Sequence, residues 1–223
     1  EEVIAHAAGG SAADVDAAVR AARAAFDSGP WPHLSVGERI AAVEKLAAVY
    51  GSHVDEMADL ITAQMGSPAS FSRLGQAAGA ATMMHLAVQN AREFPWTQRR
   101  HGLLGEAHLR RLPVGVVGII IPWNVPQNLL MPKLIPALIA GCTVVVKPAP
   151  ETPLDSLWVA EMVEEVGLPD GAQQPRVVAD HLVARGGDPR HDGTDHVGGR
   201  GDAELIEEHP TDLGRLLGDA LER

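Results

Sequence analysis

The sequence predicts an α/β fold in which an incomplete, Rossmann-like parallel sheet follows a helical N-terminal segment. The first observation is an uncharged run rich in Val and Ile, from Val114 to Ile121, which is typical of a strand buried on both faces. Leucines at helical spacing follow it, and Gly141 stands where a C-cap glycine ends a helix. A second β-branched run extends from Thr143 to Val146. Two buried strands joined by a helix form a βαβ unit, whose connection is right-handed in nearly all proteins.

Helices are expected before this unit. Ser11 to Asp14 resembles a capping box, and it starts a helix that ends near Gly29. A regular capping box from Ser35 to Glu38 starts the next helix. Residues 52–55 start another, and the stretch from Gly75 to Arg92 has helical spacing with many small residues. Apolar faces at helical spacing are most often core, so we interpret these helices as scaffold.

The segment that joins the helices to the first strand is polar. Phe94 to Gly105 carries Arg99, Arg100 and His101 together, a cluster typical of a solvated loop. Glu106 to Leu112 alternates weakly in polarity, which indicates an exposed strand. We therefore expect a surface loop followed by one strand.

Thr152 is the expected N-cap of the helix that follows the second strand of the βαβ unit. Pro153 would take the first helical position, and Asp155 would supply the acidic residue of a capping box. The stretch from Gly167 to Gly171 then ends this helix.

The composition changes abruptly after Gly171, which divides the chain into residues 1–171 and 172–223. The second part contains no Phe, Trp, Tyr, Met or Lys, and Arg185 to Asp202 is mostly Gly, Asp, Arg and His. Such a stretch cannot bury enough apolar surface to offset its ordering entropy, so we expect a disordered tail. Our hypothesis is that this tail is read out of frame, or is otherwise foreign to the parent gene.

Composition argues against several classes of protein. The net charge of −11 and the isoelectric point near 5.3 do not favour binding to nucleic acid or to anionic membranes. No apolar run reaches the roughly 18 residues of a membrane-spanning helix, and the first residues lack the pattern of a signal peptide. The single cysteine and the spacing of the histidines match no disulfide framework or zinc motif. We expect a cytoplasmic protein without membrane, nucleic-acid or metal partners.

A candidate site lies where the two strands of the βαβ unit end, because ligands of such units bind at the carboxyl ends of the strands. The first strand ends in the turn 122–124, which contains Asn124, and the second ends at Lys147. The two loops would therefore present a carboxamide and an ammonium side by side. A purely structural interpretation of each residue remains open: Asn124 could form a hydrogen bond within its own turn, and Lys147 could be a solvated lysine at a strand end.

Several short motifs indicate a family. The first strand and its turn contain I-I-P-W-N, the second strand lies in A-G-C-T-V-V-V-K-P, and the next helix begins with E-T-P-L. Upstream stand R-R-L-P-V-G-V-V-G and A-A-R-A-A-F-D-S-G-P-W. In this order and at this spacing the motifs resemble the aldehyde dehydrogenase superfamily, from Glu1 to about Gly171. The resemblance implies oxidation of a small-molecule aldehyde to a carboxylic acid through a cysteine thioester, with NAD or NADP, in a homo-oligomer. It also implies that a strand pair near residues 106–112 helps to join subunits.

The resemblance assigns roles to individual residues. Asn124 would donate its amide N–H to the aldehyde oxygen as negative charge develops there, and one such donor is typically worth about 3–4 kcal/mol. Lys147 would bind the adenosine ribose, and Ile121, Pro122, Trp123 and Asn124 would line the cofactor cleft.

The acidic residue that follows the lysine is displaced in this sequence. Many family members place it three positions after the lysine, where this chain has Pro150, and the acid here is Glu151. A carboxylate on the ribose disfavours the 2′-phosphate of NADP, so the displacement leaves the choice between NAD and NADP open.

The remaining catalytic motifs of the family do not occur in this chain. Cys142 lies at the entry to a buried strand, so we interpret it as a small buried residue and not as the nucleophile. Without a thiolate and a general base, we expect this chain alone to be an inactive, truncated form of the enzyme. Two alternatives remain: a non-catalytic nucleotide-binding or subunit-interaction module, and an unstable fragment whose strand Thr143 to Val146 has an unpaired edge.

Overall fold

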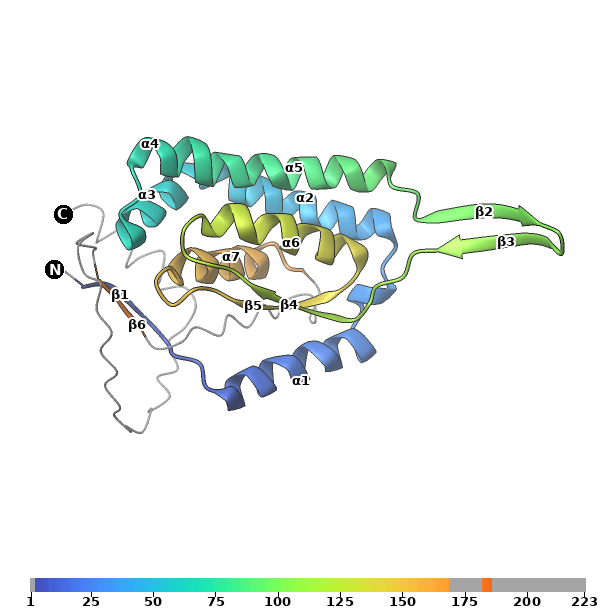
Figure 1. The fold of residues 1–223 in the computed structure, drawn as a ribbon, viewed down its shortest axis with the longest axis horizontal. Helices are drawn as coiled ribbons and strands as arrows, with labels where there is room; N and C mark the ends of the chain where they lie inside the picture. The colour runs from blue at the N-terminus through green and yellow to red at the C-terminus, as the bar shows by residue number, and fades with distance from the viewer. Residues whose placement is uncertain (1–2, 169–181, 186–223) are drawn as a thin grey trace.

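A computed structural model of the chain describes residues 3–168 and 182–185 (Figure 1). It has helices packed on a short parallel sheet, which confirms the predicted α/β class. The elements in chain order are β1 (Val3–Ala7), α1 (Ala12–Ser28), η1 (Trp31–His33), α2 (Val36–Ser52), α3 (Val54–Met65), α4 (Ala69–Phe71), η2 (Ser72–Ala77), α5 (Ala78–Glu93), β2 (Thr97–Gly102), β3 (Gly105–Arg110), β4 (Val116–Ile120), α6 (Pro126–Ala140), β5 (Thr143–Lys147), α7 (Leu154–Glu165) and β6 (Leu182–Arg185).

The predicted βαβ unit is present. β4 and β5 pair in parallel, with Val116 opposite Thr143 and Ile120 opposite Lys147, and α6 connects them. Gly141 ends α6 with φ of 93°, a left-handed conformation that favours glycine. The C-cap expected from the sequence is therefore confirmed.

Helices cover both faces of this sheet (Figure 1). On one face, Val145 packs with Ala18 and Ala22 of α1, and the Thr143 hydroxyl donates a 2.9 Å hydrogen bond to the Ala22 carbonyl. On the other face, alternate residues of β5 join the main core with α2, α6 and α7. The alternation of a strand thus explains how one short strand ties α1 to the body.

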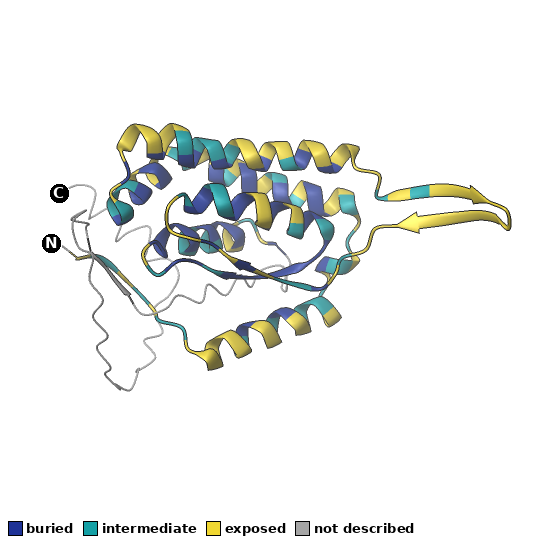
Figure 2. Cartoon of the chain, viewed as in Figure 1, coloured by how far each residue is buried: buried dark blue, intermediate teal, exposed yellow. Residues whose placement is uncertain are grey.

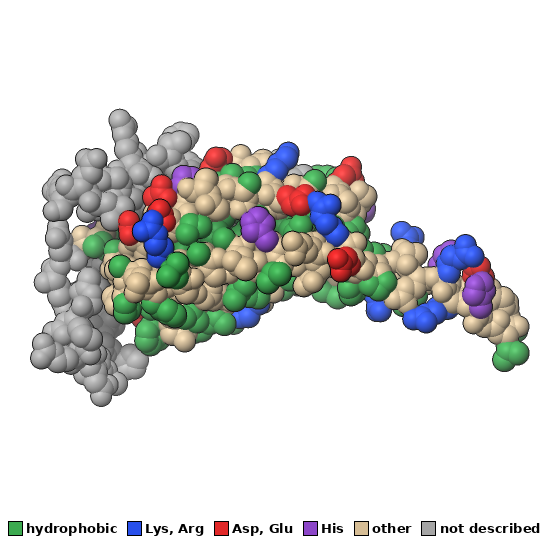
Figure 3. Space-filling model, turned by 90° about the horizontal axis from the view of Figure 1, so that it is seen from above, with side chains coloured by type: hydrophobic (Ala, Val, Ile, Leu, Met, Phe, Trp, Pro, Cys, Tyr) green, Lys and Arg blue, Asp and Glu red, His purple; other side chains and the backbone are tan. Residues whose placement is uncertain are grey.

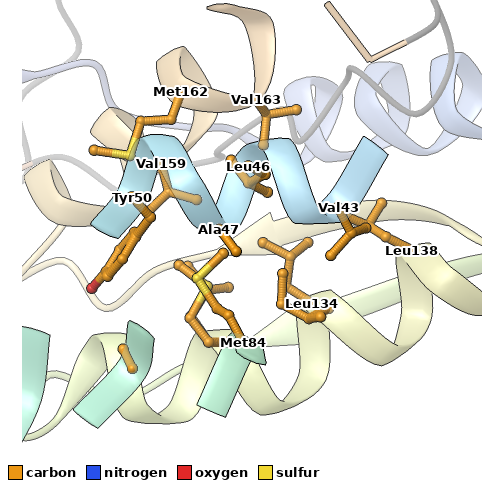
Figure 4. Close-up of a cluster of buried hydrophobic side chains, with 14 of the residues drawn as sticks. Val43, Leu46, Ala47, Tyr50, Met84, Leu134, Leu138, Val159, Met162 and Val163 are labelled. Carbon is orange, nitrogen blue, oxygen red and sulfur yellow. The ribbon is translucent and has the colours of Figure 1, made fainter. Parts of the chain in front are cut away.

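The main core is centred on α2, as Figure 4 shows. Its side chains come from four helices that are distant in sequence, and each is almost fully buried. Burying one such Leu or Val side chain typically stabilises the fold by about 1.5–3 kcal/mol. The labelled members are Val43, Leu46, Ala47, Tyr50, Met84, Leu134, Leu138, Val159, Met162 and Val163.

The prediction that the first strand is buried on both faces was wrong for its carboxyl end. Ile119 is 2% exposed, but its neighbour Ile120 is 72% exposed and Gly118 is also exposed. The reason is that α1 covers β5 and only the start of β4, at Val116.

Two of the three expected capping boxes are present, those that begin at Ser11 and at Ser35. The Asp14 carboxylate accepts a 2.7 Å bond from the Ser11 amide, and the Glu38 carboxylate accepts one of 2.7 Å from the Ser35 amide. The hydrogen bonds from Ser35 lower the pKa of Glu38. At these two helix starts, the short motif was sufficient to predict its own side-chain contacts.

The helix expected from Gly75 to Arg92 begins later, at Ala78, and a π-helical stretch, η2, precedes it. Two hydrogen bonds hold this stretch: the Thr62 hydroxyl donates to Ser72, and the Gln76 amide donates to Ser67 at 3.1 Å. These partners lie outside the helix, so the spacing inside it could not reveal the π-turn.

The prediction of a loop from Phe94 to Gly105 was wrong, because β2 forms there and pairs with β3 in an antiparallel hairpin. Glu106 of β3 links the strands through an ion pair to Arg99 of β2, at 3.0 Å, and its carboxylate also lies 3.2 Å from the imidazole of His108 on its own strand. The hairpin projects from the body as an arm and is almost entirely exposed (Figure 2). Polar residues on both faces hide the period of two by which a strand is recognised.

Thr152 is not the N-cap of α7. The helix starts after Pro153, and the Leu154 amide donates a 3.1 Å bond to the side-chain carbonyl of Gln64 instead. Asp155 is fully buried and accepts a 2.8 Å bond from Gln127. A glutamine distant in sequence takes the place of the local cap, and the residues around position 152 give no sign of this contact.

An unpredicted strand, β1, pairs with β6 in an antiparallel sheet. The tetrapeptide Leu182–Arg185 lies in the tail for which we expect disorder, and the rest of 169–223 lies outside the described residues. Among the helices that the structure describes, none is long and apolar enough to cross a bilayer.

Candidate functional site

The two strand ends that the sequence singles out lie side by side. Ile120 is paired with Lys147 at the last position of the ladder, and the Ile121 amide donates a 3.2 Å hydrogen bond to the Lys147 carbonyl. The turn 122–124 therefore begins beside the end of β5. This juxtaposition follows from the parallel pairing and was expected.

Asn124 is exposed in the bend that precedes α6. Its carboxamide makes no hydrogen bond within the part of the chain that the structure describes, which counts against a merely local turn role. It stands beside the N-terminus of a helix of 15 residues, where unpaired amides and the helix dipole favour negative charge. The arrangement can therefore stabilise an anion.

The other residues expected at the cleft differ in exposure. Trp123 is 51% exposed and Pro122 is exposed, so both present side-chain surface beside the strand ends. Ile121 is 2% exposed and belongs to the main core, so its side chain supports the turn from behind.

Lys147 and Glu151 supply an ammonium at the end of β5 and a carboxylate in the loop that follows it. Lys147 is half-buried, with its ammonium 3.5 Å from the Pro148 carbonyl, and Glu151 is exposed in the loop before α7. An ammonium and a carboxylate are a donor and an acceptor of the kind that ribose hydroxyls need. Among the residues that the structure describes, a methyl group added at Gly118 would meet no atom within 4 Å, so none of them covers this face of β4.

Sequence reasoning missed a buried polar pair behind the turn. Gln127, three residues after Asn124, donates to Asp155 in the first turn of α7. Burial raises the pKa of Asp155 to about 6, and the bond from Gln127 partly opposes this rise. The pair fixes the start of α6 against the start of α7. Asp155 was noticed in the sequence only as a residue of a capping box.

Asn128 was also missed, although it lies one helical turn after Asn124. Its amide donates a 2.6 Å bond to the Gly75 carbonyl, and its buried side-chain oxygen has no hydrogen-bond partner among the described residues. A methyl group added at Gly79 would lie 3.2 Å from that oxygen, so glycine allows the two helices to approach. An asparagine inside an apolar helix pattern was the available signal.

Cys142 is buried, 3% exposed, at the entry to β5, as expected for a structural residue. The Arg39 guanidinium lies beside the adjacent glycine and donates a 2.8 Å bond to the Ile139 carbonyl, which satisfies the end of α6. Within the described ranges, no three His, Cys, Asp or Glu side chains converge as a metal site.

Comparison with known proteins agrees with these features. The model of the aldehyde dehydrogenase family matches residues 1–184. Aldehyde dehydrogenase 1 of Tanacetum cinerariifolium is 41% identical over 171 residues, which are 77% of this chain and 34% of that protein. The putative aldehyde dehydrogenase DhaS of Bacillus subtilis is 40% identical over 72% of this chain and 32% of its own length.

A solved structure shows the same fold. The aldehyde dehydrogenase of Mycobacterium tuberculosis, determined in complex with NAD+, has a TM-score of 0.75 and 42% identity, and it covers 80% of this chain and 36% of its own. The chain thus spans about a third of the length of the relatives it matches. The family match includes part of the segment after Gly171. From its motifs, its βαβ unit and these matches, the chain belongs to the aldehyde dehydrogenase family.

Proposed function

We propose that this chain is the N-terminal portion of an NAD(P)-dependent aldehyde dehydrogenase, whose whole form oxidises a small-molecule aldehyde to a carboxylic acid. The observation that carries the proposal is the pairing of Ile120 with Lys147, which sets the Asn124 turn beside the lysine at one sheet edge. Membership of the family supplies the reaction class.

Asn124 has the role of an oxyanion donor in this proposal. When a thiolate attacks an aldehyde carbon, the carbonyl oxygen gains negative charge, and an amide N–H directed at it stabilises that charge. The carboxamide of Asn124 makes no hydrogen bond within the described residues, and it lies near the positive end of α6.

Lys147 and Glu151 bind the ribose of the cofactor in this proposal, and the exposed ring of Trp123 forms part of the cleft wall. When bound, the nicotinamide cofactor accepts the hydride that leaves the aldehyde carbon. The preference between NAD and NADP depends on where the Glu151 carboxylate lies relative to the 2′-position, because a carboxylate there repels a phosphate.

The nucleophile and the general base are not supplied by this chain in the proposal. Its one cysteine, Cys142, is buried in the body of the fold, and covalent catalysis needs an accessible thiolate beside a base. We therefore expect no aldehyde oxidation by the purified chain. Production of NADH from any aldehyde, abolished by Asn124→Ala, would contradict this.

A second candidate is a non-catalytic module that binds nucleotide or another subunit. The projecting arm of β2 and β3 favours it, because the arm contributes no side chain to the main core. We also predict a homo-oligomeric parent, a cytoplasmic location and no nucleic-acid partner.

Calorimetric titration of the whole chain with NAD+ and NADP+ tests the cofactor site. Lys147→Met should weaken binding by about tenfold to a hundredfold, as expected for loss of charged hydrogen bonds. Lys45→Met, which alters an exposed lysine of α2, is the matched control and should leave binding unchanged. Equal affinity of both variants would overturn the site, and binding of neither cofactor by the native chain would overturn the nucleotide role.

A further inference from the structure

A buried polar cluster lies behind the Asn124 turn, where α6 and α7 begin. Gln127 of α6 and Asp155 of α7 are both 0% exposed, whereas side chains of these types are rarely buried completely. Figure 3 shows Asp and Glu side chains on the surface of the body, the usual place for a charged group. Because α6 and α7 follow the ends of β4 and β5, the cluster lies at the same sheet edge as the candidate site. The reaction proposed above uses neither side chain.

The contacts of Asp155 suit its ionised form. The side-chain amide of Gln127 donates a 2.8 Å bond to one carboxylate oxygen, and the backbone amide of Ser156 donates a 2.9 Å bond to the other. An ionised carboxylate only accepts hydrogen bonds, so both contacts stabilise its negative charge. Burial opposes them more strongly and raises the pKa of Asp155 to about 6, so the side chain gains its proton in mildly acidic solution.

The helices α2, α3 and α6 pack against α7, and each presents a polar side chain to this carboxylate. Tyr50 comes from α2, Gln64 from α3 and Gln127 from α6. Burial raises the pKa of Tyr50 above its ordinary value, so its hydroxyl keeps its proton, and the two glutamines carry no charge. Within this cluster, Asp155 is therefore the group whose charge changes near pH 6.

Hydrogen-bond acceptors for a protonated Asp155 are already in place. The side-chain oxygens of Gln127, Thr152 and Ser156 are buried and have no partner among the described residues, which is unfavourable. A protonated carboxyl group has an O–H to donate. A half-turn of the Gln127 amide about its Cγ–Cδ bond exchanges nitrogen and oxygen, and it presents the unpaired oxygen to the new donor.

Among the described residues, Gln127 and Asn128 hold the first turn of α6 by side-chain hydrogen bonds. Val125, the N-cap residue, has no side-chain group that can cap the helix. In place of a cap, Gln127 binds Asp155 of α7, and Asn128 donates a 2.6 Å bond to a backbone carbonyl of η2. Of these two bonds, only the first contains a group that titrates. Asn124 lies three residues before Gln127, so a change in that bond acts on the turn that carries Asn124.

We propose that Gln127 and Asp155 are positioning residues for Asn124, and that proton binding by Asp155 switches the start of α6 between two arrangements. The inference rests on the role proposed for Asn124 and deepens it. While Asp155 is ionised, Gln127 donates to it, and the turn is held as the structure shows. When Asp155 takes a proton from solvent, the hydrogen bond reverses its direction, the Gln127 amide rotates, and Asn124 moves with the first turn of α6. Stabilisation of an oxyanion by Asn124 then depends on pH through residues that touch neither substrate nor cofactor.

Nuclear magnetic resonance of the full chain between pH 4.5 and 7.5 tests the switch without any ligand. The carbon-13 signal of the Asp155 carboxyl group reports its protonation, and the side-chain amide signals of Asn124 report the turn. Both should shift with the same midpoint, near pH 6, and the indole signal of Trp123 in the same turn should follow them. Asn124 signals that stay constant while Asp155 titrates would overturn the proposal. So would an Asp155 that keeps one protonation state over the whole range.

Two variants test whether Asp155 is the group that titrates. Asp155→Asn removes the charge and keeps an oxygen to which Gln127 can donate, so it should abolish the pH-dependent shift of the Asn124 signals. Glu161→Gln is the matched control, because Glu161 is half-buried on the same helix and burial raises its pKa to about 7. It should leave the shift near pH 6 unchanged. Loss of the shift in the control, or its persistence in Asp155→Asn, would contradict the assignment.

Gln127→Met separates the hydrogen bond from the charge. Methionine is unbranched and adaptable, so it fills the place of the glutamine without an amide. Asp155 should then still titrate, with a higher midpoint, because its ionised form loses a donor. The Asn124 signals should no longer follow it. If they still do, the charge acts directly on the turn, and the positioning role of Gln127 is wrong.

These measurements do not depend on cofactor binding. The spectrum of each variant also shows whether the chain is folded, so a loss of structure is not mistaken for a loss of coupling. If the chain binds neither NAD+ nor NADP+ but the Asn124 signals follow Asp155, the nucleotide role is wrong and this inference holds. If a cofactor binds and the signals do not follow, only this inference is wrong.

Discussion

Two of the small sheets that the structure describes, β4–β5 and β2–β3, differ in almost every physical respect. In the β4–β5 sheet, Val144 and Val146 are 2% exposed, and helices pack on both faces. In the β2–β3 arm, almost every residue is exposed, and an ion pair between Arg99 and Glu106 links the strands. Burial stabilises the first sheet as part of the core, whereas cross-strand pairs worth about 0.2–1 kcal/mol each hold the second. The comparison teaches that one sheet specifies the fold and the other supplies a surface.

The largest expected effect separates a core leucine from an arm leucine. Leu134→Ala removes a side chain that is 2% exposed in the main core, and it should lower the free energy of unfolding by about 2–5 kcal/mol. Leu103→Ala, at the tip of the arm, should change that free energy by less than about 0.5 kcal/mol. Urea denaturation of both variants measures the contrast. Equal losses would show that the arm is part of the cooperative core.

A pH-dependent effect is expected in the buried region. The folded pKa of Asp155 is raised to about 6 from 3.8, so the folded state binds the proton more tightly than the unfolded chain. The contribution of Asp155 to the free energy of unfolding should therefore be greatest below pH 4, and it should be lost as the pH rises through 6. The loss is roughly 2–3 kcal/mol in total.

Asp155→Asn should abolish this part of the pH dependence, because the asparagine oxygen can still accept from Gln127 and carries no charge. Urea denaturation of the native chain and the variant at pH 4, 5.5 and 7 measures the free energy of unfolding of each protein. Subtracting one from the other cancels the contributions of all other titrating groups. A difference that does not change with pH would refute the burial of a charged carboxylate at this position.

Each of the two regions has a glycine with positive φ, Gly141 beside the core and Gly105 in the arm, so alanine substitutions compare the cost of backbone strain in the two regions. Gly141→Ala at the end of α6 combines left-handed strain with crowding, because its methyl group would lie 3.1 Å from the Arg39 guanidinium. A loss of about 1–3 kcal/mol of unfolding free energy is expected. In Gly105→Ala, the added methyl group would meet no atom of the described residues within 4 Å, so this variant should cost only the local strain. Thermal denaturation should show the larger decrease in Tm for Gly141→Ala, and the reverse order would contradict this account.

The smallest effect concerns the ion pairs of the arm. Glu106→Gln removes the charge that faces Arg99 and His108, and these are exposed pairs in high dielectric. Folding stability should change by less than about 1 kcal/mol, and less still at high salt. Denaturation at low and high ionic strength measures it. A loss of stability as large as that expected for a core substitution would mean that the arm is coupled to the body more strongly than its contacts indicate.

Most patterns that are complete within a few residues were predicted correctly, and the exception is the capping box expected at Thr152. The apolar runs of β4 and β5, the left-handed Gly141 and the two capping boxes each depend on neighbours close in the chain. The juxtaposition of the Asn124 turn with Lys147 also followed, because the ends of adjacent parallel strands meet at one edge. The functional roles of these two residues remain proposals.

What the sequence by itself determined is the class of fold, the family and the place of the candidate site. What only the tertiary structure decided depends on partners far apart in the chain. Gln64 replaces Thr152 as the cap of α7, and Gln127 pairs with the buried Asp155. An apolar groove also forms where α5, α6 and the base of the β2–β3 arm meet. The exposure of one face of β4 was also decided only by the tertiary structure, since it depends on how far α1 extends over the sheet. Local motifs carry their own contacts, but long-range contacts exist only once the chain has brought distant segments together.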